Sequence, residues 1–129
     1  MRVPRVFTSF DYDHDDDLRT LLVGQSRHPD TPFELADWSV KEHLMGNWQD
    51  KVRTRIRCVD QVLVLCGLYT HLAEGVGIEL RIAREERKPY FLLAGRSSVT
   101  CTKPATALVA DKVYTWSWDN LKKLIGGAR

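Results

Sequence analysis

The feature that most constrains the fold is a pair of short, unbroken apolar runs, QVLVLCG at 61–67 and YFLLAG at 90–95. A strand that packs against helices on both of its faces has this pattern, because neither face needs polar side chains. The segment between the runs carries apolar residues at helical spacing and ends at Lys88-Pro89, where proline stops a helix. This order predicts two neighbouring parallel strands joined by a crossover helix.

The same alternation continues on both sides of this unit. Strands are expected at three further places: 5–10, 33–38 and 113–118. Helix starts are expected at three places with capping residues: 15–17, Asn47 and Asp119. Five alternations of strand and helix predict an α/β fold, a doubly wound, flavodoxin-like parallel sheet of five strands with helices on both faces. The length of 129 residues fits one domain, 1–129.

Composition limits the expected partners. The formal net charge is +2, which gives no reason to expect nucleic acid. No apolar stretch of signal-peptide length follows the basic N-terminus, and the longest apolar run, VLVLCGLY, is too short to span a bilayer. The cysteines Cys58, Cys66 and Cys101 have no metal-type spacing and are expected to be reduced. We therefore expect a cytoplasmic protein without a membrane partner or a bound metal.

The segment SFDYDHDDD, residues 9–17, places five aspartates directly after the first predicted strand. Ligands bind at the carboxyl ends of parallel strands, and carboxylates there would repel a phosphate by roughly 1 kcal/mol for each close pair. This disfavours a flavodoxin-type phosphate loop. A phosphorelay receiver is disfavoured as well, because 65–67 lacks its phosphate-accepting Asp and 116–118 lacks its Lys. The last three aspartates are interpreted as first-turn helix residues, with a magnesium site as the less favoured alternative.

Three ordered segments carry a family resemblance: VFTSFDYDHD (6–15), FELADWSVKE (33–42) and VDQVLVLCGLYTHLAEGVGIELRIAREERKPYFLL (59–93). Over about residues 5–95 the chain resembles the TIR-like domains of the Thoeris antiphage system, and its ending YTWSWDNLKKLI is similar too. The resemblance implies a TIR-like fold and an enzyme that releases nicotinamide from NAD⁺, which is its substrate and not a cofactor. It further implies self-association through TIR contacts and a cyclic ADP-ribose-type signal that reaches a separate effector protein.

Glu79 is the catalytic residue that the resemblance implies, since active TIR domains use a glutamate at this place in the helix. Glu79 lies about one turn into its predicted helix, and helical side chains lean toward the helix N-terminus and thus toward the strand ends. A carboxylate there can stabilise oxocarbenium-like charge or orient ribose hydroxyls. A solvated helix glutamate is the plainer interpretation. The chain departs from many animal and plant TIR domains at 74–76, where EGV replaces a serine or tryptophan.

Six further residues are expected to bind the substrate: Phe10, Asp11, Asp13, Trp38, Thr70 and His71. Aspartates near the cationic nicotinamide would be attractive, and the pyrophosphate would then lie nearer the amides of Gly75 and Gly77 at a helix N-terminus. The aromatic rings can stack on nicotinamide or adenine, and the threonine and histidine can contact ribose or phosphate. For Trp38, Thr70 and His71 a place in the core, at the rim or in solvent is the plainer alternative.

Two functions of other classes stay open. The domain can be a scaffold that assembles through TIR–TIR contacts without turnover, or a sensor that binds NAD-like ligands without cleaving them. Neither Ser9 nor Cys66 has a base beside it in the sequence, so no nucleophilic triad is expected. If NAD⁺ is cleaved, attack by water gives ADP-ribose and attack by a ribose hydroxyl gives a cyclic product.

Overall fold

The computed structural model describes residues 3–36 and 46–128. Its five strands form one parallel sheet in the order β2-β1-β3-β4-β5. The strands are β1 (Arg5–Ser9), β2 (Glu34–Leu35), β3 (Gln61–Cys66), β4 (Tyr90–Ala94) and β5 (Val113–Thr115). This is the strand order of the flavodoxin-like fold, so the predicted α/β fold class is confirmed.

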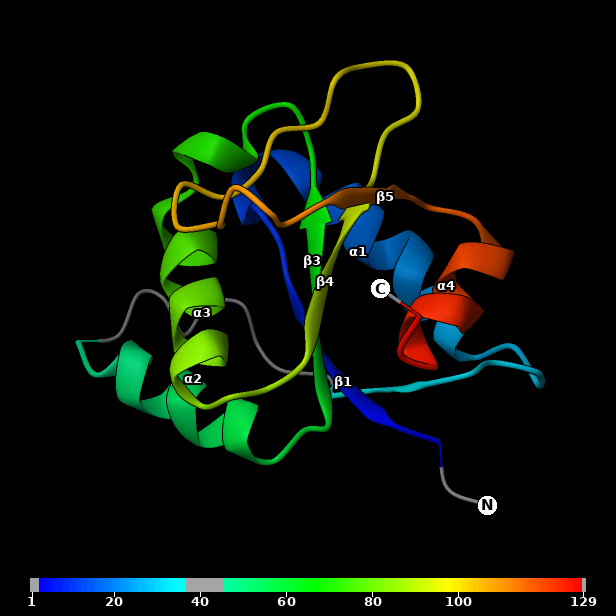
Figure 1. Ribbon diagram of the computed structural model, residues 1–129, viewed down its shortest axis with the longest axis horizontal. Coiled ribbons are helices and arrows are strands. Elements are labelled where there is room, and N and C mark those ends of the chain that lie inside the picture. Colours follow the sequence, from blue (N-terminus) through cyan, green and yellow to red (C-terminus); the bar gives the residue numbers. More distant parts are fainter. Residues whose placement is uncertain (1–2, 37–45, 129) are drawn as a thin grey trace.

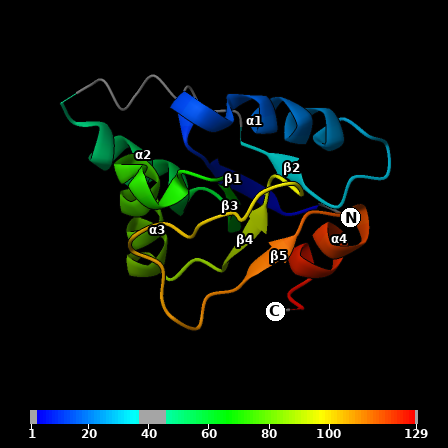
Figure 2. The same ribbon diagram turned by 90° about the horizontal axis from the view of Figure 1, so that it is seen from above.

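In residues 3–36 and 46–128, four α-helices cover the two faces of the sheet, and a short 3-10 helix, η2, precedes the third. They are α1 (Tyr12–Ser26), α2 (Trp48–Arg57), η2 (Thr70–Leu72), α3 (Glu74–Glu85) and α4 (Trp118–Ile125). Figure 1 shows α2 and α3 on one side of the sheet and α1 and α4 on the other. Figure 2, turned by 90°, shows the same separation. Within the described residues, no helix is long and apolar enough to cross a membrane.

β3 is the centre of the core, as its continuous apolar sequence predicts. All six of its residues are buried. Val62, Val64 and Cys66 pack with α2 and α3, whereas Leu63 and Leu65 pack with α1 and α4. Successive strand residues point to opposite faces, so one strand supplies both halves of the core.

α3 is the helix that the sequence locates best. Val76, Leu80 and Ala83 are buried on its sheet-facing side, as their spacing predicts. The helix ends at Glu85, and Arg87 then adopts a left-handed backbone with φ of 56°. This turn directs the chain into β4.

The predicted helix starts are wrong in detail at two of the three places, and the start at Asn47 is confirmed. α1 is capped by Asp11 and not by 15–17, because the Asp11 side chain accepts the Asp13 N–H at 3.2 Å. Asn47 stands at the N-cap of α2, but its side chain makes no capping hydrogen bond. α4 is capped by Ser117 and not by Asp119, since the Ser117 hydroxyl accepts the Asn120 N–H at 3.0 Å.

Strand ends also differ from the prediction. β1 ends one residue early, at Ser9, because Asp11 begins α1 directly afterwards. Within the described residues β2 covers only Glu34–Leu35, and the predicted remainder from 37 to 38 lies outside them. β5 ends at Thr115, since the cap at 117 starts α4 within the segment predicted as strand.

Candidate functional site

The carboxyl ends of β1 and β3 lie side by side at the centre of the sheet. The chain leaves β1 through α1 on one face and leaves β3 through α3 on the other face. In sheets of this order, ligands bind where the connections separate in this way. Figure 1 shows η2 and the long connection from β4 to β5 above these strand ends. Residues at these ends are therefore the candidates for a functional site.

A buried hydrogen bond joins the end of β1 to α3. The Ser9 hydroxyl donates to Glu79 Oε1 at 2.6 Å, and the exposed fractions are 1% for Ser9 and 5% for Glu79. Ser9 lies two residues after Phe7, which packs with α2 and α3, so the two side chains share a sheet face. A buried carboxylate is costly unless it is hydrogen-bonded, and this contact offsets part of that cost. Sequence reasoning missed the pair, although the Phe7–Ser9 spacing indicates the face.

An acidic cavity of about 260 Å³ opens between the start of α1 and the start of α3. Its lining comes from two segments, 10–14 and 72–76. Three carboxylates belong to this lining: Asp11, Asp13 and Glu74. Phe10 lines the cavity too, and is 5% exposed, so it also belongs to the core. The structure thus brings together three of the six predicted substrate-binding residues, at the N-terminus of α3.

Glu79 lies next to this cavity but deeper in the protein. The cavity lining includes Val76, three residues or about one helical turn before Glu79, and includes neither Glu79 nor Ser9. At the N-terminus of α3, Ala73 provides no side-chain cap for the first-turn amides. From the sequence, the Gly77 amide is expected to lie near the pyrophosphate. Its N–H instead donates to the Ala73 carbonyl at 3.2 Å and is used within the helix.

Asp11 is held through both carboxylate oxygens. Oδ1 accepts the Asp13 N–H, and Oδ2 lies 2.6 Å from His14 Nδ1. The His14 ring in turn contacts the Tyr69 ring, with 4.6 Å between centroids. Asp11 is 7% exposed, and His14 lines the same cavity beside it.

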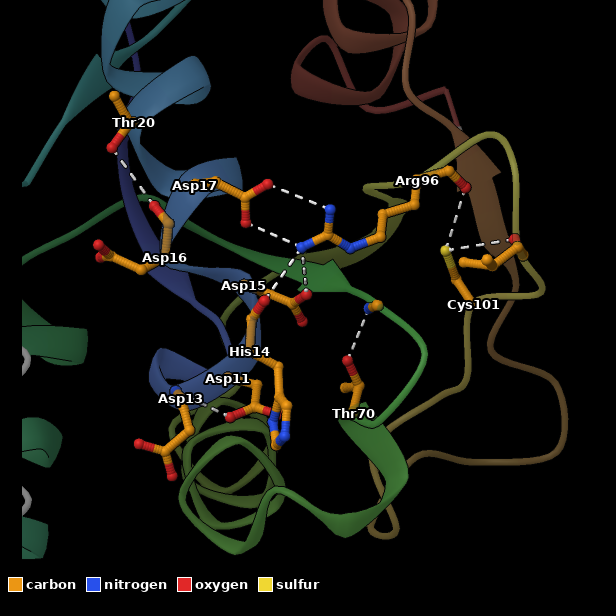
Figure 3. A network of polar contacts seen from close by, with 12 residues as sticks. Asp11, Asp13, His14, Asp15, Asp16, Asp17, Thr20, Thr70, Arg96 and Cys101 are labelled. Carbon is orange, nitrogen blue, oxygen red and sulfur yellow. Dashed lines mark hydrogen bonds and ion pairs between the residues drawn. The ribbon is translucent and has the colours of Figure 1, made fainter.

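Arg96, two residues after the end of β4, binds the first turns of α1 (Figure 3). Its Nη2 lies 3.1 Å from Asp15 Oδ1 and 2.8 Å from Asp17 Oδ1, and it donates to the His14 carbonyl at 3.0 Å. α1 is kinked here, because Asp15 has a non-helical backbone with φ of −123° and ψ of 19°. Sequence reasoning missed this ion-pair network, since nothing marks one arginine of a polar connection as the partner of two aspartates.

Burial and the Arg96 guanidinium shift the pKa values of Asp15 and Asp17 in opposite directions. Asp15 is 1% exposed, and desolvation raises the pKa of its carboxyl despite the nearby Arg96 guanidinium. The hydrogen bond from Arg96 lowers the pKa of the Asp17 carboxyl, which is solvent-exposed. Asp15 is thus the buried partner of Arg96, and Asp17 is the exposed one.

Thr70 and His71 lie in η2 and do not line the acidic cavity. Thr70 is fully buried, and its hydroxyl accepts the Gly67 N–H at 2.7 Å. His71 is exposed, and both its backbone N–H and its Nδ1 contact the Thr102 hydroxyl, at 3.0 and 2.9 Å. Both residues shape the loop after β3, and a direct role in substrate binding stays a prediction.

Two further expectations concern Trp38, as a substrate-binding residue, and Ser9 and Cys66, which are not expected to act as nucleophiles. Trp38 lies outside the described residues. Cys66 is a free, buried thiol, and desolvation raises its pKa to about 12, so it is held as the unreactive thiol at neutral pH. Ser9 has a carboxylate beside it in the fold, because its hydroxyl donates to Glu79. In the part of the chain described, no three His, Cys, Asp or Glu side chains are placed to hold a metal ion.

Comparison with known proteins gives no family. No family model and no curated protein matches the chain. Among solved structures, the glutaminase domain of Trypanosoma brucei CTPS with bound acivicin is similar over 73% of this chain and 37% of that chain. The sequence identity is 18% and the TM-score is 0.48. A similarity this low carries no argument about the site or its chemistry.

Proposed function

We propose that this protein is a TIR-like enzyme that cleaves the nicotinamide glycosidic bond of NAD⁺, with Glu79 as its catalytic residue. The observation that carries the proposal is the buried Glu79 carboxylate, hydrogen-bonded to Ser9 at the carboxyl end of β1. Its position agrees with the role that the sequence resemblance implies for a glutamate in this helix. The acidic cavity one helical turn away provides the space in which a substrate can approach.

The chemistry of glycosidic cleavage suits a buried carboxylate. When nicotinamide departs, positive charge develops on the ribose, as in other oxocarbenium-like transition states. A fixed negative charge in a site of low dielectric stabilises that charge more strongly than water does. Glu79 would supply the charge or orient the ribose hydroxyls, and its burial would keep it from being screened.

The charge of the cavity supports a cationic ligand. Asp11, Asp13 and Glu74 line it, and nicotinamide carries a positive charge while it is bound in NAD⁺. At 4 Å, opposite charges attract by about 1 kcal/mol in water and by about 4 kcal/mol near a protein surface. The phosphates would be repelled from the aspartates, so we place them nearer the first-turn amides of α3, such as that of Gly75.

The resemblance extends the proposal to the product. A ribose hydroxyl that attacks the cleaved centre would give a cyclic ADP-ribose-type signal, which a separate effector protein would sense in antiphage defence. Attack by water would instead give ADP-ribose. Analysis of the products by chromatography and mass spectrometry separates the two outcomes.

The test is nicotinamide release from NAD⁺ at high protein concentration by the wild type, Glu79→Gln and Glu85→Gln. Glutamine keeps the size of glutamate and removes its charge. Glu85 is the control, because it belongs to the same helix but pairs with Arg53 at the surface, away from the cavity. Release by the wild type and Glu85→Gln, with none by Glu79→Gln, would support the proposal. Equal release by all three would remove Glu79 from the chemistry.

One observation favours the alternative function, a scaffold or a nucleotide sensor that acts by assembly. Three apolar side chains around η2 are exposed, with Leu68 at 40%, Tyr69 at 44% and Leu72 at 70%. Exposed apolar side chains that lie together are typical of interaction surfaces. Light scattering over a range of concentrations tests this, since a scaffold would self-associate with or without NAD⁺.

A further inference from the structure

We propose that Ser9 is a positioning residue, whose hydroxyl holds the Glu79 carboxylate in the orientation that bond cleavage needs. This inference rests on the proposed NAD⁺-cleaving function and assigns Ser9 a role that its sequence position alone does not indicate. In this proposal Ser9 takes no covalent part in the reaction, and its hydroxyl donates to a carboxylate oxygen of Glu79. It acts through Glu79.

The contact has the geometry of a strong hydrogen bond. The Oγ–Oε1 distance is 2.6 Å, and both side chains are at least nine-tenths buried. Hydrogen bonds from a hydroxyl to a carboxylate are short and stronger than bonds between neutral groups. Little water competes at this depth, so the bond determines where Oε1 lies.

Ser9 is held more rigidly than Glu79, so the hydrogen bond positions Glu79 and not Ser9. Ser9 is the last residue of β1 and pairs with Val64 in the central strand β3. Glu79 is a helix side chain with three rotatable bonds, each with several staggered or broad minima. The sheet therefore fixes Ser9, and Ser9 in turn fixes the carboxylate. Correct placement of a catalytic group within a fraction of an ångström is a large part of catalysis.

The neighbouring Thr8 provides a matched control. It precedes Ser9 in the same strand and lies on the opposite face of the sheet. Its hydroxyl is buried and makes no hydrogen bond within the described residues. Thr8→Val removes a hydroxyl and keeps the shape of the side chain, one residue from the proposed positioning residue.

The experiment measures kcat and KM for nicotinamide release, together with the thermal unfolding midpoint, for the wild type, Ser9→Ala, Ser9→Thr and Thr8→Val. Ser9→Ala removes the hydroxyl, whereas Ser9→Thr keeps it and suits a strand. We expect kcat of Ser9→Ala to fall by about tenfold or more while KM changes by less than about twofold. We expect Ser9→Thr to restore most of kcat and Thr8→Val to behave as the wild type.

The outcomes separate this inference from the function on which it rests. Wild-type kcat in Ser9→Ala would overturn the positioning role and leave the NAD⁺-cleaving function standing. Equal loss in Ser9→Ala and Ser9→Thr would overturn it as well, because packing and not the hydroxyl would then matter. A fall in kcat that is matched by the fraction of protein unfolded at the assay temperature would assign Ser9 to stability alone. A folded wild type that releases no nicotinamide would overturn both proposals.

Discussion

Asp15 occupies the space that any side chain at position 67 would need. A Cβ atom built on Gly67 overlaps both carboxylate oxygens of Asp15. Asp15 cannot swing away easily, because it is 1% exposed and is bound by Arg96. Gly67 is therefore required by a close approach between the loop after β3 and the first turns of α1.

We expect Gly67→Ala to lower the free energy of unfolding by about 1–3 kcal/mol, since an extra methyl group in a filled site forces its neighbours to move. Urea unfolding measures the change. Gly24→Ala is the control, because nothing lies within 4 Å of a Cβ there and alanine in a helix is favoured over glycine by roughly 0.5–1 kcal/mol. A Gly67→Ala protein as stable as the wild type would show that Asp15 is not held in place.

The raised pKa of Asp15 gives a pH dependence with a definite sign. Burial raises the pKa of this carboxyl above its ordinary value, so the folded protein holds the proton more tightly than the unfolded chain does. The stabilisation that comes from this tighter proton binding is present at acid pH and is lost as the pH rises through the folded-state pKa of Asp15. Asparagine does not ionise, so the stability of Asp15→Asn relative to the wild type should increase over this rise. Urea unfolding at several pH values from about 3 to about 7 tests this; a constant difference would contradict it.

At the scale of elements, strong periodicity was sufficient for prediction and local capping signals were not. β3, α3 and β4 follow from long apolar patterns that only one element type satisfies. In SFDYDHDDD, five aspartates can each cap a helix, and the choice depends on where β1 stops pairing with β3. The same ambiguity arises at the start of α4, where a serine and an aspartate stand two residues apart.

The start of α4 can be tested directly. Ser117→Ala should lower the free energy of unfolding by about 1 kcal/mol, because it removes the hydroxyl that accepts the Asn120 N–H. Asp119→Ala should change it by less than about 0.5 kcal/mol, since Asp119 is exposed and faces Lys123 across one turn at 3.7 Å. Chemical denaturation of both variants is the measurement. A larger loss in Asp119→Ala than in Ser117→Ala would restore the cap predicted from the sequence.

At the scale of the whole molecule, the candidate site is made of contacts between distant segments. Ser9 and Glu79 are 70 positions apart, and Arg96 and Asp15 are 81 apart. The predicted doubly wound, flavodoxin-like sheet is enough to bring the carboxyl ends of β1 and β3 together, and with them the aspartate-rich segment 9–17 and the start of α3. Which side chains then pair depends on the face and depth of each residue, so the family resemblance implied Glu79 as a candidate but not its partner.

The sheet also divides the core into two clusters that should contribute independently to stability. Ile56 in α2 and Leu121 in α4 are fully buried on opposite faces. Each change to alanine should lower the free energy of unfolding by about 2–5 kcal/mol, through lost burial and the cavity it leaves. The two residues share no cluster, so the losses in the double variant should add within about 0.5 kcal/mol.

Each variant should nevertheless unfold in one transition, because β3 belongs to both clusters. Urea unfolding followed by both fluorescence and far-UV circular dichroism tests this; separate transitions for the two probes would show that the faces unfold independently.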